Sequence, residues 1–157
     1  MDGAEVRSQR LVSFLQEVFE TTYSFDLEGL QKKGLKQAAK QLARYQAAND
    51  YVSAWVVQRS LGGHAIPLDA PTLRCARRLG LVESDDEGRE AARASLEHLV
   101  PKAKGPQFTD LISTVAGEHC WEEDPNCPGC PLAHECPTGH SAVSANGTGR
   151  SGRPKPR

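Results

Sequence analysis

Four of the chain's five cysteines lie within 17 residues, and this group has the clearest chemistry in the sequence. Their spacing is C-x6-C-x2-C-x5-C, and three prolines and a glycine in this segment bend the backbone so that four sulfurs can converge. Thiolates so close together either form disulfides or bind a metal. The four residues are Cys120, Cys127, Cys130 and Cys136.

The cellular compartment decides between disulfides and a metal. The start of the chain, MDGAEVRSQR, has no apolar signal-peptide core, so we expect an intracellular protein. No apolar run approaches the ~20 residues that a membrane span needs, so we expect no membrane partner. In a reducing compartment a cysteine cluster is more often a metal site than a set of disulfides. The sequence therefore predicts a metal site over residues 120–136.

The spacing also bears on the identity of the metal. Only Cys127 and Cys130 form a CxxC pair, whereas zinc sites usually present two such pairs separated by a longer span. Four thiolates from one short loop suit a [4Fe-4S] cluster, which takes one cysteine per iron. We therefore predict a [4Fe-4S] cluster, with zinc as the alternative and a metal-free loop as the third possibility. His119 and His134 are expected to be hydrogen-bond donors beside the cluster, surface residues or zinc ligands, and Cys75 a small buried helix residue.

The segments that must position this loop have helical periodicity almost throughout, and none alternates with the period of two typical of strands. The sequence therefore predicts an all-α protein. Asn49 and Asp69 each stand where a helix is expected to begin, and Pro71 would lie in the first turn of the second of these helices. In the helix expected over residues 5–20, one face is predicted to carry Leu11, Leu15, Val18 and Phe19.

The charge of the chain is uneven, although the net charge is only −1. Nucleic-acid binding must therefore come from local patches and not from bulk attraction. Residues 31–44 carry five basic side chains and no acidic one, and a second basic group follows Asp69. Each group is either a solvated helix face or a phosphate-binding surface. The residues that we expect to hold phosphates are Lys40, Arg44, Arg74 and Arg77.

The cysteine spacing resembles that of the endonuclease III family of helix-hairpin-helix DNA glycosylases. The segment GGHAIPLDAPTLRCARRLGLV is similar to the family segment in which an aspartate opens a helix just after the hairpin. The segment FDLEGLQKKGLKQAAKQLARYQAANDYVSAWVV is similar to the helices that lead into and through the hairpin. The likeness covers about residues 5–137. It implies a DNA repair protein that is cytoplasmic, nucleoid-associated and bound to double-stranded DNA.

By this resemblance Asp69 is the catalytic aspartate. Breaking an N-glycosidic bond builds positive charge on the sugar, and a nearby carboxylate can stabilise that charge and take a proton from an attacking water. At a helix N-terminus the macrodipole stabilises the negative charge. The alternative is that Asp69 is only an N-cap.

Tyr51 falls where bifunctional members of the family carry a lysine that forms a Schiff base with the sugar and then cuts the strand. Tyrosine cannot do this, so the resemblance implies a monofunctional glycosylase without AP-lyase activity; the alternative for Tyr51 is a half-buried helix aromatic. The family hairpin corresponds to residues 45–51, where we expect Ala47 and Asn49 to contact DNA. This stretch has no glycine, which departs from the family's glycine-rich hairpin.

The family has further helices before the region matched here, and they help to form the base pocket. We therefore expect a helical bundle of the helix-hairpin-helix glycosylase type that lacks the family's N-terminal helices and is closed by a C-terminal [4Fe-4S] loop. The expected domain spans residues 1–137, followed by a disordered tail over residues 138–157. A second subunit could supply the missing helices. The alternative function is a non-catalytic iron–sulfur protein that binds DNA or a partner.

Overall fold

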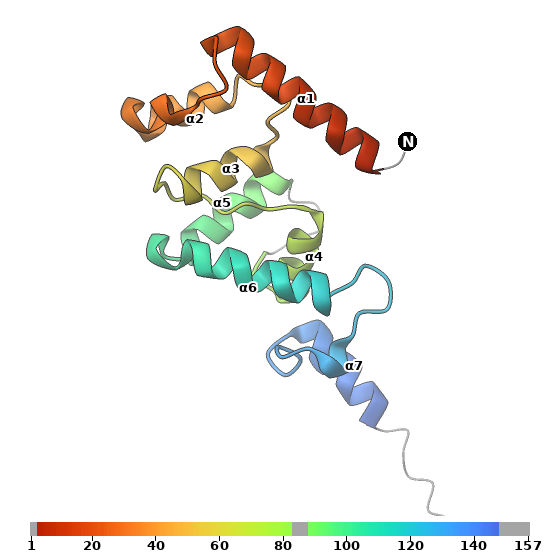
Figure 1. Ribbon diagram of the computed structural model, residues 1–157. Coiled ribbons are helices and arrows are strands. Elements are labelled where there is room, and N and C mark those ends of the chain that lie inside the picture. Colours follow the sequence, from red (N-terminus) through yellow and green to blue (C-terminus); the bar gives the residue numbers. More distant parts are fainter. Residues whose placement is uncertain (1–2, 83–87, 148–157) are drawn as a thin grey trace, which may run out of the picture. The chain divides into compact units, whose positions relative to one another are not determined.

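The computed structural model describes residues 3–82 and 88–147 of the chain. Over these ranges the regular structure is entirely helical and contains no strand, which confirms the predicted all-α class (Figure 1). The described elements are, in chain order, α1 (Gly3–Thr22), η1 (Glu28–Lys33), α2 (Leu35–Leu42), α3 (Asp50–Arg59), α4 (Ala70–Arg78), α5 (Arg89–Leu99), η2 (Lys102–Lys104), α6 (Gly105–Glu118), η3 (Cys127–Gly129) and α7 (Pro137–Gly147).

The chain divides into two compact units. The first consists of Met1–Leu68 and Val100–Pro106, and the second of Asp69–Leu99 and Gln107–Arg157. The first unit therefore holds α1 to α3 with η1 and η2, and the second holds α4, α5, η3, α7 and most of α6. A single domain over residues 1–137 stays a prediction.

The first unit has its core where α2 packs against η1 and α3. The Asn49 side chain caps α3 by accepting a hydrogen bond from the Val52 amide at 2.9 Å. Asp26, two residues before η1, accepts one from the Glu28 amide at 2.7 Å. Gly34, with a φ of 74°, separates η1 from α2 in a conformation that favours glycine. The fully buried members of this core are Leu30, Ala38 and Leu42, and Leu27, Val56, Val57 and Leu61 pack against them.

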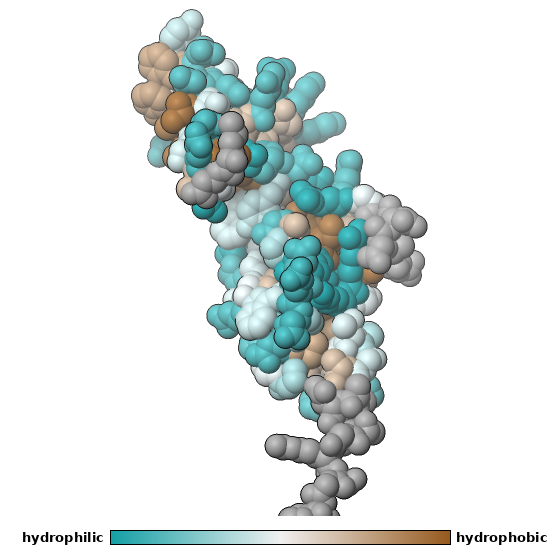
Figure 2. Space-filling model, turned by 90° about the vertical axis from the view of Figure 1, so that its right-hand side faces the viewer, coloured by the Kyte–Doolittle hydropathy of each residue, from teal (hydrophilic) through white to brown (hydrophobic). Residues whose placement is uncertain are grey.

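Of the four residues predicted to form an apolar face on helix α1, only Val18 is buried. One turn before Val18, Phe14 makes an edge-to-face contact with Tyr45 at 5.6 Å between ring centroids. Leu11 remains 59% exposed and Phe19 46% exposed. Apolar side chains are accordingly visible at the surface of the first unit (Figure 2).

The second unit begins with α4, whose start at Asp69 was predicted and is confirmed. Pro71 lies in its first turn, where the missing amide hydrogen costs nothing because that amide has no partner inside the helix. Gly80, with a φ of 72°, follows the end of the helix. The buried residues that α4, α5 and α6 contribute to this unit include Leu73, Cys75, Ala76, Ala92, Leu96, Ile112 and Ala116.

The C-terminal end differs from the expected disordered tail over residues 138–147, because these residues belong to helix α7. Pro137 begins this helix, and α7 contacts η3 in the cysteine loop. The amide of His140 donates to the carbonyl of Cys136 at 2.8 Å, so the helix follows directly from the last cysteine. Residues 148–157 of the predicted tail lie outside the described residues.

Candidate metal centre and catalytic residues

The four cysteines selected by their spacing line one cavity in the second unit. Cys120 follows α6, Cys127 and Cys130 stand at the start of η3 and just after its end, and Cys136 directly precedes α7. Two short irregular segments, with η3 between them, therefore bring together sulfurs that are up to 16 positions apart. The fifth cysteine, Cys75 of α4, lines the same cavity.

The sulfurs influence one another electrostatically. The pKa of the Cys127 thiol is raised, first by burial and then by the negative charge of the thiolates at Cys136, Cys120 and Cys130. Arg78 acts in the opposite direction on the same thiol. Without a cation among them the thiolates oppose each other's ionisation. A positively charged metal centre would remove this penalty.

Cys75 is the most protected of the five. It is only 1% exposed, and burial, followed by the charge of Cys120, raises its pKa to about 12. Cys75 lies outside the C-x6-C-x2-C-x5-C group and forms part of the cavity wall. Its burial agrees with the prediction of a small buried helix residue.

The backbone of the loop is held by its own hydrogen bonds. The amide of Asn126 donates to the carbonyl of His119 at 2.9 Å, which closes the segment between the first two cysteines. The Asn126 side chain accepts from the amide of Gly129 at 3.2 Å and caps η3. The amide of Cys130 then donates to the carbonyl of Cys127 at 3.1 Å.

Two arginines of α4 hold the segment around the first cysteine. Arg74 donates to the Cys120 carbonyl through Nε at 3.0 Å and Nη2 at 2.9 Å. Arg78 donates through Nη1 to the Cys120 sulfur at 3.5 Å and to the Trp121 carbonyl, and through Nη2 to the Glu122 carbonyl at 3.0 Å. The Arg74 side chain, which we expected at a phosphate, thus faces the cysteine loop. DNA contacts of Arg74 and of the half-buried Arg77 stay predictions.

Helix α7, which the sequence analysis did not predict, supports the last cysteine. The Cys136 thiol donates to the carbonyl of Arg78 at 3.1 Å, and the Thr138 hydroxyl donates to the same carbonyl at 3.3 Å. The amide of Gly139 donates to the Cys136 sulfur at 3.4 Å. The available signal was Pro137 directly after Cys136, since proline is frequent in the first turn of a helix.

Gly139 lies where α7 comes closest to the loop, and its replacement by alanine is expected to destabilise the second unit by about 1–3 kcal/mol. An added Cβ would lie 2.9 Å from the carbonyl oxygen of Ala133 and 3.1 Å from its Cα, and these are backbone atoms that cannot rotate away. The free energy of unfolding from a urea titration measures the loss. Gly117→Ala in α6 is the matched control, because a Cβ there meets no atom within 4 Å. It should stabilise the helix by up to about 1 kcal/mol, and equal effects of the two substitutions would contradict the close contact at Gly139.

The residues around the cavity fit an iron–sulfur cluster in their chemistry. Besides Cys75 they supply the four thiols of the C-x6-C-x2-C-x5-C group, and the imidazole Nδ1 of His119 is buried without a hydrogen-bond partner among the described residues. Such an orphaned polar atom indicates that a further group belongs in the cavity. Within residues 3–82 and 88–147, no group of three or more His, Cys, Asp or Glu residues is placed to hold a metal ion.

Asp69 forms the N-cap of α4 and belongs to a reciprocal capping box. Its Oδ1 accepts from the Thr72 amide at 2.8 Å and from the Thr72 hydroxyl at 2.7 Å, and the Asp69 amide donates to the same hydroxyl at 2.9 Å. Thr72 is only 1% exposed, so the cap is fixed by the core. Among the described residues, Oδ2 of Asp69 takes part in no hydrogen bond. One carboxylate oxygen therefore holds the helix, and the other can face a substrate.

Tyr51 lies on α3 in the first unit, whereas Asp69 opens the second unit. It is half-buried, and its ring stacks on that of Trp55 at 6.2 Å between centroids with an interplanar angle of 26°. The guanidinium of Arg59 lies 4.8 Å from the centre of the Trp55 ring and makes a cation–π contact with it.

The turn between α2 and α3 contains the two expected hairpin contacts, Ala47 and Asn49. The Asn49 side chain is used as the cap of α3. The Ala47 amide donates to Oε2 of Glu17 in α1 at 3.5 Å. The Glu17 carboxylate therefore occupies the backbone amide that we expected to bind a DNA phosphate.

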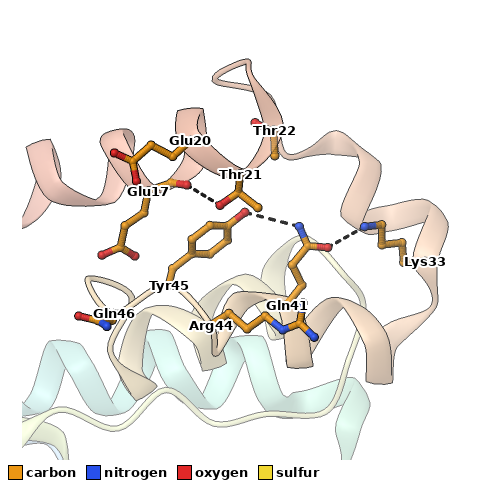
Figure 3. Close-up of a pocket in the computed structure, with 9 residues that line it drawn as sticks. All are labelled: Glu17, Glu20, Thr21, Thr22, Lys33, Gln41, Arg44, Tyr45 and Gln46. Carbon is orange, nitrogen blue, oxygen red and sulfur yellow. Dashed lines mark hydrogen bonds between the residues drawn. The ribbon is translucent and has the colours of Figure 1, made fainter.

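Glu17 belongs to a pocket of about 590 Å³ with both acidic and basic residues in its wall (Figure 3). In this pocket Lys33 donates to Oε1 of Gln41 at 2.7 Å, and the Gln41 amide donates to the Tyr45 hydroxyl at 3.5 Å. Glu20 adds a second carboxylate. This mixed lining is unsuited to an anion such as a phosphate.

A neighbouring groove of about 300 Å³ carries basic groups and no acidic one. Its cations are Lys33, Lys40 and Arg44, and Gln37 and Gln41 complete it. All five side chains come from η1, α2 and the residues that follow α2. Lys40 and Arg44, two of the predicted phosphate contacts, are thus brought together in the first unit.

The comparisons with known proteins find matches by structure but none by sequence. No protein-family model matches the chain, and none of the curated proteins is similar enough in sequence to match it. A solved structure of a trapped endonuclease III–DNA covalent intermediate, an estranged-adenine complex, has a TM-score of 0.66 and 22% sequence identity over 83% of this chain and 57% of that chain. A non-covalent endonuclease III–DNA complex gives the same TM-score and identity over 83% of this chain and 56% of that chain. The fold is endonuclease III-like.

The endonuclease III-like fold confirms the predicted helical architecture, and the chain spans just over half of the length of the two solved endonuclease III chains. Among the described residues, no helix is both long and apolar enough to cross a membrane. The cofactor, the catalytic roles of Asp69 and Tyr51, the DNA contacts and a second subunit stay predictions on this fold.

Proposed function

We propose that the chain is a monofunctional DNA N-glycosylase of base excision repair that removes a damaged or mispaired base from double-stranded DNA. The observation that carries this proposal is the position of Asp69 in an endonuclease III-like fold, at the N-terminus of α4 with Oδ2 free of hydrogen bonds among the described residues. The helix macrodipole stabilises its negative charge, and the cap with Thr72 fixes its orientation.

In this mechanism Oδ2 of Asp69 stabilises the positive charge that builds on the sugar as the bond to the base breaks, and it accepts a proton from the attacking water. Tyr51, in the position of the family lysine, has no amine with which to form a Schiff base. Water is therefore the nucleophile, and the product is an abasic site in an uncut strand.

The cofactor in this proposal is a [4Fe-4S] cluster held by Cys120, Cys127, Cys130 and Cys136. Bound there, the cluster would have a structural role: Cys120 after α6, Cys127 and Cys130 at η3 and Cys136 before α7 would hold it, and its positive charge would offset the mutual repulsion of their thiolates. Zinc is the alternative occupant. Metal analysis of the purified protein separates them, with about four irons per chain expected for the cluster and about one zinc for the alternative.

The function is tested with duplexes that carry mispaired or oxidised bases. The protein should convert one of them to an abasic site that is cut only after alkali treatment. Strand cleavage without alkali would contradict the assignment of Tyr51, and no release from any duplex would favour the second candidate function.

That second candidate is a non-catalytic iron–sulfur protein that binds DNA or a partner. It is favoured by the contact between Ala47 and Glu17, because this carboxylate competes with a phosphate at the hairpin backbone. It is also favoured by the glycine-free turn. A second subunit that supplies further helices is compatible with both candidates.

DNA affinity is expected to depend on the basic groove of Lys33, Lys40 and Arg44. Replacement of Lys40 and Arg44 by alanine should weaken binding to all duplexes and lower the slope of log affinity against log salt by about 1 for each phosphate that the variant no longer binds. Fluorescence anisotropy at several salt concentrations measures the slope. Lys104→Ala is the matched control, since Lys104 is exposed on η2 outside this groove, and an equal loss of affinity there would contradict a local site.

A further inference from the structure

His119 has an imidazole whose surroundings the proposed function does not explain. Its ring lines the cavity of the four cysteines, and its Nδ1 is buried without a hydrogen-bond partner among the described residues. The backbone on both sides of the ring is fixed, because the His119 amide donates to Val115 at 3.1 Å and its carbonyl accepts from Asn126 at 2.9 Å. The end of α6 and the loop therefore fix the main chain from which the ring projects.

A buried ring nitrogen without a partner is destabilising, so its presence calls for a partner that belongs in the cavity. In a neutral imidazole one nitrogen carries a hydrogen and can donate it. The groups that this cavity collects are sulfurs, and the nearest cysteine in sequence is Cys120, whose sulfur already accepts from Arg78 at 3.5 Å. Hydrogen bonds to the sulfurs of an iron–sulfur cluster are among the factors that set its reduction potential.

We propose that Nδ1–H of His119 donates a hydrogen bond to a sulfur of the bound cluster and thereby raises the cluster's reduction potential. The inference rests on the proposed [4Fe-4S] cofactor. A donor draws negative charge from the sulfur, and the reduced cluster carries one more negative charge than the oxidised one. The hydrogen bond therefore stabilises the reduced form more than the oxidised form. His119 acts here as a positioning and tuning residue and not as a ligand, since the four cysteines already provide one thiolate for each iron.

The test compares iron content and reduction potential in the cluster-loaded protein. His119→Leu removes the donor and should keep wild-type iron content while its potential, measured by protein-film voltammetry, falls below that of the wild type. His119→Gln, whose amide can donate, should return the potential toward the wild-type value. His134→Leu is the matched control, because His134 is exposed outside the cavity, and it should leave both quantities unchanged.

Each outcome decides between specific alternatives. An iron-loaded His119→Leu protein with wild-type potential overturns the inference alone. Loss of iron in both His119 variants would make His119 a ligand and would also overturn it. If the wild-type protein contains no iron, the proposed [4Fe-4S] cofactor itself is wrong. The metal analysis detects this result before any reduction potential is measured.

A second measurement keeps the inference testable if His119→Leu does not fold. In reduced wild-type protein labelled with ¹⁵N-histidine, pulsed electron–nuclear double resonance should detect a coupled ¹⁵N nucleus and an exchangeable proton. The ¹⁵N signal should remain in His134→Leu and disappear in His119→Gln, whose amide, like Arg78 and the Gly139 amide, can still supply an exchangeable proton. Absence of the ¹⁵N coupling from the wild type would overturn the hydrogen bond.

Discussion

Cys130→Ser is expected to leave the protein without iron and with its second unit unfolded. Serine does not replace a thiolate in the cluster, and three remaining cysteines cannot supply one ligand for each iron. Because the metal site does not exist in the unfolded chain, its binding free energy is also folding free energy. That contribution is comparable to the whole stability of a small domain, about 5–15 kcal/mol. Iron analysis and far-ultraviolet circular dichroism measure the two losses.

Cys75→Ala is the matched control for this result. Cys75 lines the same cavity and is 1% exposed, but it lies on α4, outside the C-x6-C-x2-C-x5-C spacing. Its replacement should leave the iron content unchanged and reduce stability only modestly. Equal iron losses at Cys75 and Cys130 would show that the C-x6-C-x2-C-x5-C spacing does not select the ligands.

The features that could be predicted from the sequence are those with local chemical causes. Asn49 and Asp69 cap helices because their short polar side chains accept hydrogen bonds from amides three residues further on, and both caps occur as predicted. The cysteine spacing places four sulfurs within 17 residues, and the structure brings all four to one cavity. In both cases the partners are close in sequence, so little tertiary information is needed.

The features that could not be predicted depend on partners far away in sequence. Periodicity indicated an apolar face on α1, but of that face only Val18 is buried, and the neighbouring Phe14 packs against Tyr45, 31 residues further along the chain. Helix α7 has few apolar residues, and its contacts with the cysteine loop hold it in place. The basic pattern of α4 suggested phosphate contacts, and it did not indicate that Arg74 donates two hydrogen bonds to the carbonyl of Cys120, 46 residues away.

Asp69→Asn should reduce base release by at least about 100-fold while leaving DNA binding and folding close to wild type. An amide cannot accept a proton from water, and it offers no charge to the developing sugar cation, so the contribution of about 10²–10⁴-fold expected from a general base is lost. Asparagine is, however, as good an N-cap as aspartate, and its side-chain oxygen can still accept from the Thr72 amide. Single-turnover release from the best duplex, anisotropy and thermal unfolding measure the three properties.

Asp69→Ala completes the comparison, because it removes the charge and the cap together. It should lose about 1 kcal/mol of stability, which Asp69→Asn should not, and the two variants should be equally inactive. If activity follows stability across the two variants, Asp69 acts only as a helix cap and the non-catalytic function gains support. If Asp69→Asn is stable, binds DNA and releases no base, the carboxylate charge itself is required. The capping box with Thr72 would then be the device that fixes Oδ1 and so orients Oδ2 toward the sugar.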